Sequence, residues 1–394
     1  MVSLSILSAL SVAQVFFFTA SALVLPRDPE PSASSAVTSL SKNPYLTFKQ
    51  ECISGTALGY PRESRDGGNG GNIAGKTVMT FSDTQWWAYD GDTDVSMTTN
   101  SYAYIKSTSA PTELLELGTD GTPAQAAFLT ANETKEDYDL WPYDIGLTTR
   151  TWDGLGEEAY AIYNVALRAP EVIEYSTLVK YTTDASLDSP LTSTRVVQKW
   201  IDGTDKMWGN FGQASHNGDY MFLFHTGIDN CLELARIPWD RVDDTSQIEW
   251  YSNTTGWNKN PDDWTAVGLG HYGGGGTPFW LPYYHTWAVI CTGEIDTFLI
   301  SFSTTGYVYG PYSEQQVLLQ MSSDPASNNP NYAPGVFPRF YSQDASSILL
   351  SYTYPLPHGY ETRMAKIDFT GTSATKPEYS GPTCGGDSET VLDF

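Results

Sequence analysis

Three aspartates lie where the chain could carry acid–base chemistry. Asp66 enters the glycine-rich run Gly67 to Asn72, Asp83 ends a strand-like stretch, and Asp144 lies in the sequence Leu-Trp-Pro-Tyr-Asp. Glycoside hydrolysis usually uses two carboxyl groups, one as acid and one as base or nucleophile. We predict Asp66 as base or nucleophile and Asp144 as acid, with Asp83 in either role or holding Arg65.

The spacing of these acids sets a condition on the fold. A strand of about six residues spans roughly 20 Å, so Asp66 and Asp83 face one cleft only if a glycine turn folds Asp66 back. Trp141 and Tyr143 flank Asp144 and would raise its pKa by desolvation. The alternative is that each aspartate is a turn residue that binds its own backbone.

Aromatic and cationic residues supply candidate contacts to sugar. Trp280, Tyr283 and His285 lie in one loop that Pro282 stiffens, and aromatic faces stack on the apolar faces of sugar rings. A core plug is the alternative for this loop. Arg339 is predicted to bind a carboxylate or hydroxyl, or else to pair with one of the 46 acidic residues. The predicted substrate-binding set is Arg65, Trp141, Trp280, Tyr283, His285 and Arg339.

Metal and cofactor motifs are weak in this sequence. The five histidines are scattered, which predicts no metal site. Asp90-Gly-Asp92-Thr-Asp94 begins like a calcium loop, but Val95 and Ser101 stand where an EF-hand needs Gly and Glu. A looser Ca²⁺ site stays open, and no other cofactor is predicted. Phosphate-binding, nucleophile-elbow and zinc-protease motifs are missing from the sequence.

The composition is that of an acidic, aromatic-rich secreted chain. The net charge is −25, which disfavours nucleic acid as a partner. Residues 1–22 are apolar and end in Ala20-Ser-Ala22, which predicts a secretory signal peptide, with a membrane anchor as the alternative. We therefore predict an extracellular, fungal-type monomer that has no membrane association once the signal is removed. Residues 23–45 are expected to form a disordered lead before one domain at 46–394.

Cysteines and sequons agree with secretion. Four cysteines predict two disulfides with three possible pairings. A bond between Cys52 and Cys384 would close a ring-shaped fold, and Cys231 and Cys291 could join neighbouring sheets. Asn132-Glu-Thr and Asn253-Thr-Thr are glycosylation sequons.

A strand–turn–strand pattern recurs five times after residue 65. Five groups of three or four strands predict an all-β, five-bladed β-propeller rather than a β-sandwich with long loops. The repeat is longer than that of WD40 or kelch blades. The stretch from Thr112 to Leu117 is the main helical candidate, as an insertion between the first two units.

The order of short motifs resembles the secreted five-bladed propellers of the DUF4185 family, which includes bacterial endo-D-arabinanases. The motifs are Arg65-Asp-Gly-Gly, Phe81-Ser-Asp-Thr, Leu140-Trp-Pro-Tyr-Asp-Ile-Gly, Leu234-Ala-Arg-Ile-Pro, and Tyr332 to Phe340. The resemblance covers most of residues 50–370. It implies a glycan-cleaving site in the channel mouth, at the starts of the inner strands. The resemblance also leads us to expect an acidic residue before the fourth blade, but the stretch from Gly276 to His285 contains none.

Together these features predict a secreted glycoside hydrolase acting on an extracellular polysaccharide, such as arabinan or another furanose or pyranose glycan. The alternatives are a non-catalytic carbohydrate-binding propeller and a polysaccharide lyase that uses His and Tyr on a uronate. Fold alone does not decide among them.

Overall fold

The structure is a computed structural model. It describes residues 35–59, 63–86, 96–119, 122–142, 146–203, 206–226, 230–269, 275–293, 296–327, 329–357 and 359–384. Within these ranges no helix is long and apolar enough to cross a membrane. The loop 90–94, Asp144 and the predicted signal peptide lie outside them.

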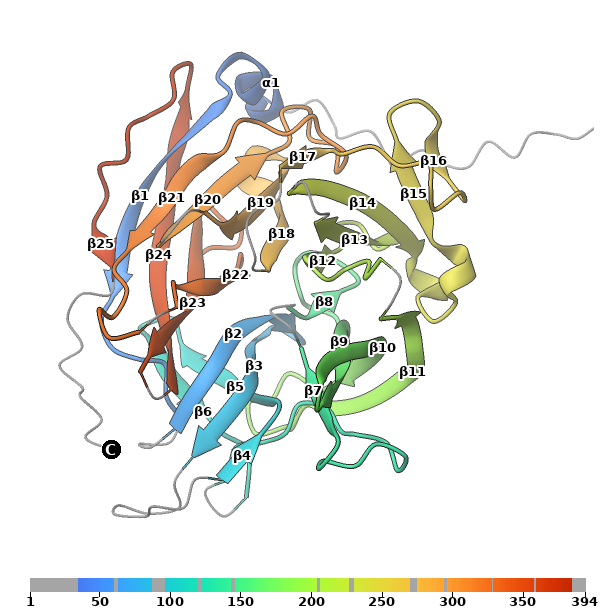
Figure 1. The fold of residues 1–394 in the computed structure, drawn as a ribbon. Coiled ribbons are helices and arrows are strands. Elements are labelled where there is room, and N and C mark those ends of the chain that lie inside the picture. The colour runs from blue at the N-terminus through green and yellow to red at the C-terminus, as the bar shows by residue number, and fades with distance from the viewer. Residues whose placement is uncertain are drawn as a thin grey trace, which may run out of the picture.

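Five antiparallel sheets surround a central axis, which confirms the predicted five-bladed β-propeller (Figure 1). Each blade begins with an inner strand next to the axis. Blade one consists of β2 (Glu63–Ile73), β3 (Lys76–Trp86), β4 (Ser96–Thr98), β5 (Ser101–Ser107) and β6 (Ala110–Leu115). Blade two consists of β7 (Tyr138–Trp141), β8 (Thr148–Thr149), β9 (Glu158–Arg168), β10 (Glu171–Thr182) and β11 (Thr192–Asp202).

The remaining blades follow in chain order. Blade three consists of β12 (Gly212–Ala214), β13 (Tyr220–Thr226), β14 (Cys231–Pro238), β15 (Glu249–Ser252), β16 (Gly256–Asn258) and β17 (Gly268–Leu269). Blade four consists of β18 (Gly276–Leu281), β19 (Thr286–Thr292), β20 (Thr297–Phe302), β21 (Gln316–Met321) and the short β25 (Thr383–Cys384). Blade five consists of β22 (Tyr332–Phe337), β23 (Ser347–Leu356), β24 (Gly359–Ser373) and β1 (Tyr45–Ile53).

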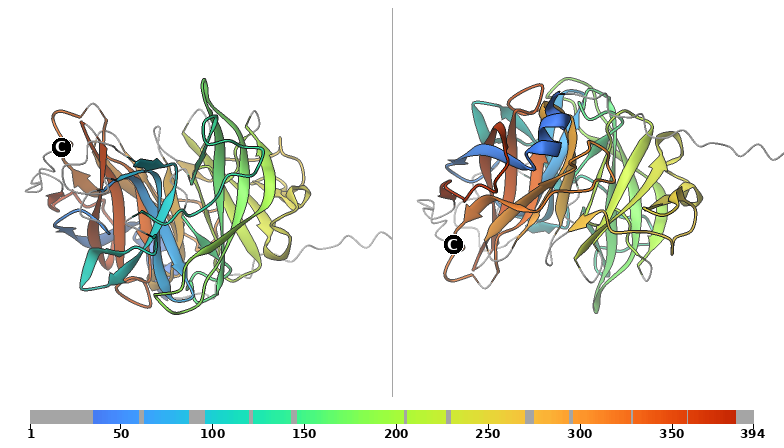
Figure 2. Two further views of the ribbon diagram at one scale, coloured as in Figure 1. Left: turned by 90° about the horizontal axis from the view of Figure 1, so that it is seen from below. Right: turned by 90° about the horizontal axis from the view of Figure 1, so that it is seen from above.

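Packing between blades explains the apolar strands of the sequence. Seen from the side, the sheets stand face to face around the axis (Figure 2). Phe222 of β13 meets Trp287 of β19 edge to face, with ring centroids 5.2 Å apart. Every residue of β19 is buried, because neighbouring blades cover both faces of a blade. Such strands are apolar without alternating, unlike strands with one face in water.

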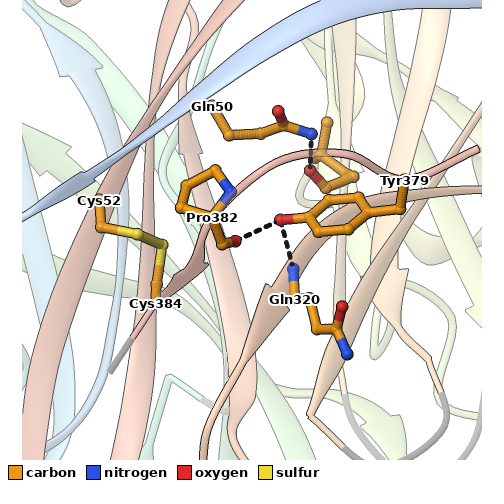
Figure 3. Close-up of a disulfide and its surroundings, with 7 residues drawn as sticks. Gln50, Cys52, Gln320, Tyr379, Pro382 and Cys384 are labelled. Atoms are coloured by element: carbon orange, nitrogen blue, oxygen red, sulfur yellow. Dashed lines mark hydrogen bonds between the residues drawn. A yellow bond between two sulfur atoms is a disulfide. The ribbon is translucent and has the colours of Figure 1, made fainter. Parts of the chain in front are cut away.

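The first and last parts of the chain close the ring. β1 pairs antiparallel with β24, so the N-terminal strand forms the outer edge of the blade built from C-terminal strands. The Cys52–Cys384 disulfide then links β1 to β25, which pairs in parallel with β21 of blade four (Figure 3). This is one of the three pairings left open by the sequence.

The C-terminal segment before Cys384 is also held by hydrogen bonds. The Tyr379 hydroxyl accepts the Gln320 N–H at 3.1 Å and donates to the Pro382 carbonyl at 2.6 Å (Figure 3). The predicted second disulfide is wrong, because Cys231 and Cys291 both keep their thiols. Cys291 is buried in the core between blades three and four.

Two local expectations differ from the structure. Helix α1 (Ser35–Lys42) lies within the segment expected to be disordered, and its Leu40 is fully buried in the core beside Tyr284. The predicted helix at 112–117 is wrong, because residues 110–115 form β6 and pair with β5. Leu114 is buried there at 1 % exposure. In both segments, burial against the propeller decides the conformation.

The ring-closing disulfide yields the first prediction. We expect the double substitution Cys52→Ser and Cys384→Ser to lower the free energy of unfolding by about 2–4 kcal/mol, because it removes a long covalent loop. Urea unfolding with and without dithiothreitol measures this. Dithiothreitol should lower the free energy of unfolding of the wild type to that of the double variant. It should leave the value for the double variant unchanged. A further loss in the double variant would reveal a second disulfide.

Candidate active site at one end of the propeller channel

All five inner strands run in the same direction along the axis. The Leu147 N–H of blade two donates to the Gly70 carbonyl of blade one at 3.1 Å. The Thr277 hydroxyl of blade four donates to the Pro334 carbonyl of blade five at 2.5 Å. Residues early in each inner strand therefore lie at one end of the channel, called here the carboxylate end. Residues late in each inner strand lie at the opposite end, called here the far end.

The glycine-rich run is an inner strand rather than the expected turn. β2 pairs with β3 through a hairpin whose turn lies at Ala74 and Gly75, both with positive φ. Added Cβ atoms would meet Val78 O at 1.9 Å from Gly70 and Leu147 O at 2.5 Å from Gly71. Glycine is required because neighbouring backbones approach this closely at the axis.

A bulge in β2 brings the first two aspartates together. The register shifts between Arg65, which faces Thr84, and Gly67, which faces Phe81. Asp66 is left opposite the segment that contains Asp83, on the neighbouring strand. Gly67 and Gly68 have φ values of +86° and +118°, conformations that side chains disfavour. The two acids are thus brought near each other by strand pairing, not by a fold-back along one strand.

Hydroxyl groups of blade five hold this bulge in place. Gly67 N–H donates to Thr353 Oγ1 at 2.8 Å, and the same hydroxyl donates to Gly67 O at 3.1 Å. Thr362 donates to Gly67 O at 3.2 Å, and Ser351 donates to Gly68 O at 2.7 Å. Side chains of blade five therefore bind the backbone of β2 where the bulge interrupts its pairing with β3.

Aromatic residues from blades two and five surround the two carboxylates. The Tyr332 hydroxyl of β22 donates to Asp66 Oδ1. The Trp141 indole N–H of β7 donates to Asp83 Oδ1 at 2.9 Å. Tyr360 packs edge to face on Tyr332, with centroids 6.5 Å apart, and both carboxylates raise the pKa of its hydroxyl, after burial as the main cause.

Burial raises the proton affinity of both acids. The pKa of Asp83 rises to about 6, because burial outweighs the Trp141 hydrogen bond and because Asp66 and Asp139 lie near it as negative charges. The pKa of Asp66 is also raised by burial, although hydrogen bonds from Tyr332, Gly67 and Thr353 oppose that shift. Burial thus favours the protonated form of both acids, and hydrogen bonds oppose that shift at each of them.

A further acid lies behind Asp83. Asp139 of β7 is 7 % exposed and forms an ion pair with Arg168 Nη2 at 2.7 Å. Asp139 raises the pKa of Asp83, and Arg168 lowers it by a smaller amount. The sequence does not identify Asp139, Tyr332 and Tyr360 as site residues, because nothing in the order of residues shows that blades one, two and five meet here.

Arg65 lies away from the two carboxylates. Its guanidinium is 1 % exposed and pairs with Glu63 at 3.0 Å and Glu116 at 2.6 Å, above the ring of Phe81. Burial raises the pKa of Glu116 to about 7, against the opposing charge of Arg65. Asp83 therefore does not hold Arg65, which is buried in the blade. Asp144 and Tyr143 lie outside the described residues.

Four predicted sugar contacts lie at the far end of the channel. Trp280 lies at the end of β18, Tyr283 and His285 follow it, and Arg339 follows β22. The Arg339 guanidinium donates to the Asp153 carbonyl at 2.5 Å. The structure thus brings Asp66, Asp83 and Trp141 together and separates them from Trp280, Tyr283, His285 and Arg339. Among the described residues, no group of three or more His, Cys, Asp or Glu side chains could hold a metal ion.

Comparison with known proteins supports the fold. No protein-family model and no curated protein sequence matches the chain. Among solved structures, a Bacteroides ovatus protein described as a candidate hydrolase superposes with a TM-score of 0.55 at 13 % identity, over 81 % of this chain and 93 % of that one. That match shows the shared propeller fold.

Two glycoside hydrolases are more distant structural neighbours. The GH43_1 enzyme from Xanthomonas citri, solved with xylose, has a TM-score of 0.47 at 11 % identity, over 84 % of this chain and 93 % of that one. The catalytic domain of the Coprinopsis cinerea GH62 α-L-arabinofuranosidase has a TM-score of 0.41 at 8 % identity, over 84 % of this chain and 99 % of that one. Both superpose too loosely to support an argument about this site.

The pKa of Asp83 predicts a pH-dependent change in stability. A carboxyl with a raised pKa stabilises the folded state below its unfolded pKa, and this stability is lost as pH rises through about 6. The amide introduced by Asp83→Asn does not titrate. We expect Asp83→Asn to gain stability relative to the wild type by roughly 2–3 kcal/mol between pH 4 and pH 7.5. Urea unfolding at both pH values measures this.

The exposed Asp262 provides the matched control for that measurement. Its side chain is exposed, so Asp262→Asn makes the same carboxyl-to-amide change outside the protein interior, and the effect of Asp83→Asn is measured relative to it. A flat difference for Asp83→Asn would show that Asp83 is not desolvated.

The bulge gives a separate prediction. Gly68→Ala should cost about 1–3 kcal/mol or more, because its Cβ would lie 2.5 Å from Thr362 Cγ2 at a positive φ. Gly256→Ala is the control, with φ +73° and no atom within 4 Å of its Cβ. It should show only the backbone strain, about 1–2 kcal/mol. Equal losses in denaturant unfolding would mean that the bulge tolerates a side chain.

Proposed function

We propose that the protein is a secreted glycoside hydrolase that cleaves an extracellular polysaccharide at the carboxylate end of the channel. The observation that carries the proposal is the pairing of Asp66 and Asp83 on adjacent strands, half-buried among Trp141, Tyr332 and Tyr360. Two carboxyl groups in different environments are what acid-assisted glycoside cleavage needs.

Their surroundings support different roles for the two acids. Asp83 holds a proton up to about pH 6 and is suited to protonate the leaving oxygen. Burial raises the pKa of Asp66, and hydrogen bonds from Tyr332, Gly67 and Thr353 favour its ionised form against that shift. It is suited to act as the base or nucleophile. The predicted acid Asp144 follows β7, the strand that carries Trp141, and stays a candidate for the leaving-group proton.

The substrate proposal follows from charge and shape. Asp66, Asp83 and Asp139 gather three carboxyl groups at this end, so an anionic uronate polymer is disfavoured on electrostatic grounds. Arabinan and other neutral furanose or pyranose glycans fit better. This argument also favours hydrolysis over the lyase alternative, which needs a uronate.

The test is a glycan panel with substitutions. Wild type, Asp66→Asn, Asp83→Asn and the control Asp262→Asn are incubated with arabinans, galactans, mannans and uronate polymers, and reducing ends and ultraviolet absorbance are read together. We expect new reducing ends without absorbance, a loss in kcat of about 10²–10⁴ in either site variant, and unchanged activity in Asp262→Asn.

Other outcomes would contradict the proposal in distinct ways. Absorbance from unsaturated ends would identify a lyase. Silence on both readouts, together with retention on a glycan array, would identify a binding module. Full activity in both Asp66→Asn and Asp83→Asn would remove these carboxyl groups from the reaction.

A further inference from the structure

A cavity that runs along the inner strands to the far end of the channel has the lining of a sugar site. Its volume is about 80 Å³, and all five inner strands or the residues that flank them contribute to its wall, from Gly70 in blade one to Pro338, which follows β22 of blade five. Its lining consists entirely of uncharged residues, although the chain has a net charge of −25. Neutral ligands suit such a wall, because a charged one would be desolvated there without a counter-charge.

One polar group of the wall has no partner. Gln213 is 6 % exposed, and its amide nitrogen donates to Gly146 O at 3.2 Å and Tyr160 O at 2.7 Å. Its Oε1 is buried without a hydrogen bond among the described residues. An acceptor left in this state costs free energy unless a ligand or water donates to it. A sugar hydroxyl is such a donor.

Aromatic rings line the cavity or pack against its wall. Trp152 lines it and is half-buried, with the Arg339 guanidinium 5.6 Å from the ring centroid. His216 stacks on Trp280 with centroids 3.8 Å apart. Burial and the nearby His285 lower the pKa of His216 to about 4, so this ring is neutral at pH 7. Flat, uncharged rings beside hydroxyl and amide groups are suited to neutral sugar faces.

The volume limits what enters. Water occupies about 30 Å³ in the liquid, so the cavity holds two or three waters or the edge of one sugar ring. A chain would cross the opening instead, with one residue inserted and its neighbours on Trp152 and His216. On β2 the cavity lining begins at Gly70, four residues beyond Asp66, so roughly 13 Å of strand separates the two.

We propose that the far end of the channel is a second, non-catalytic binding site for a neutral glycan. Trp152, His216 and Gln213 form it, and Trp280 supports His216 from behind. The site would anchor polysaccharide while the opposite end acts on it. It stands without the proposed hydrolysis, because it needs only that a neutral sugar binds.

The experiment is calorimetric titration of an inactive Asp66→Asn, Asp83→Asn chain with arabinotriose and xylotriose, and with glucuronate as charged control. We expect two trisaccharides per chain and no glucuronate at the far end. Trp152→Ala in this background should leave one trisaccharide or weaken that site about tenfold. The control Trp264→Ala replaces a half-buried tryptophan outside the cavity. It should change neither the number of bound trisaccharides nor the affinity of the far-end site.

A second variant and an activity readout guard against misfolding. Ala214→Leu narrows the cavity from within its wall and should abolish the same site, with circular dichroism confirming the fold. Trp152→Ala in the active chain should leave kcat on a short substrate unchanged. If the hydrolase proposal fails, one trisaccharide should still bind at the far end. Trp152→Ala should then abolish that binding. Unchanged binding in folded Trp152→Ala and Ala214→Leu, or equal binding of glucuronate, would overturn the proposal.

Discussion

Closure of the ring is the constraint on which the rest of the structure depends. Blade five has its outer strand from the N-terminal segment, where β1 pairs with β24 along nine residue positions. Its inner strand β22 lies against β2 of blade one. An open ring would expose these edges and unpair the closing strands. The Cys52–Cys384 bond links the outer strand of blade five to blade four, its other neighbour in the ring.

The candidate active site is built on this junction. Asp66 belongs to blade one, yet its hydrogen-bond donor Tyr332 comes from blade five, as do the hydroxyls that hold the Gly67–Gly68 bulge. The first and last thirds of the chain must therefore meet before Asp66 has its environment. Asp83 has the same dependence on blade two through Trp141. The carboxyl pair is a product of the closed ring rather than of one local motif.

The sequence predicts the architecture well and the site in part. The recurring apolar strands are enough to predict five blades, because each blade of a propeller is buried on both of its faces. Asp66 and Asp83 lie near each other because β2 and β3 form a hairpin. The turn residues 73–76 indicate that hairpin in the sequence. The segment 110–115 shows the limit, because its leucines fit a helix until β5 provides a strand partner. Trp280 and Arg339 show a second limit of prediction from sequence. They lie at the opposite end of the channel from Asp66 because the inner strands share one direction, which the order of residues does not reveal.

The two ends of the channel divide polar chemistry between them. The carboxylate end buries acids whose raised pKa values cost folding free energy at neutral pH, as is common at functional sites. The far end has an uncharged lining, and His216 beside it stays neutral. An acidic chain that keeps the lining of this cavity free of charge separates two kinds of contact with a glycan. Proton transfer needs the first end, and retention of a neutral polymer needs only the second.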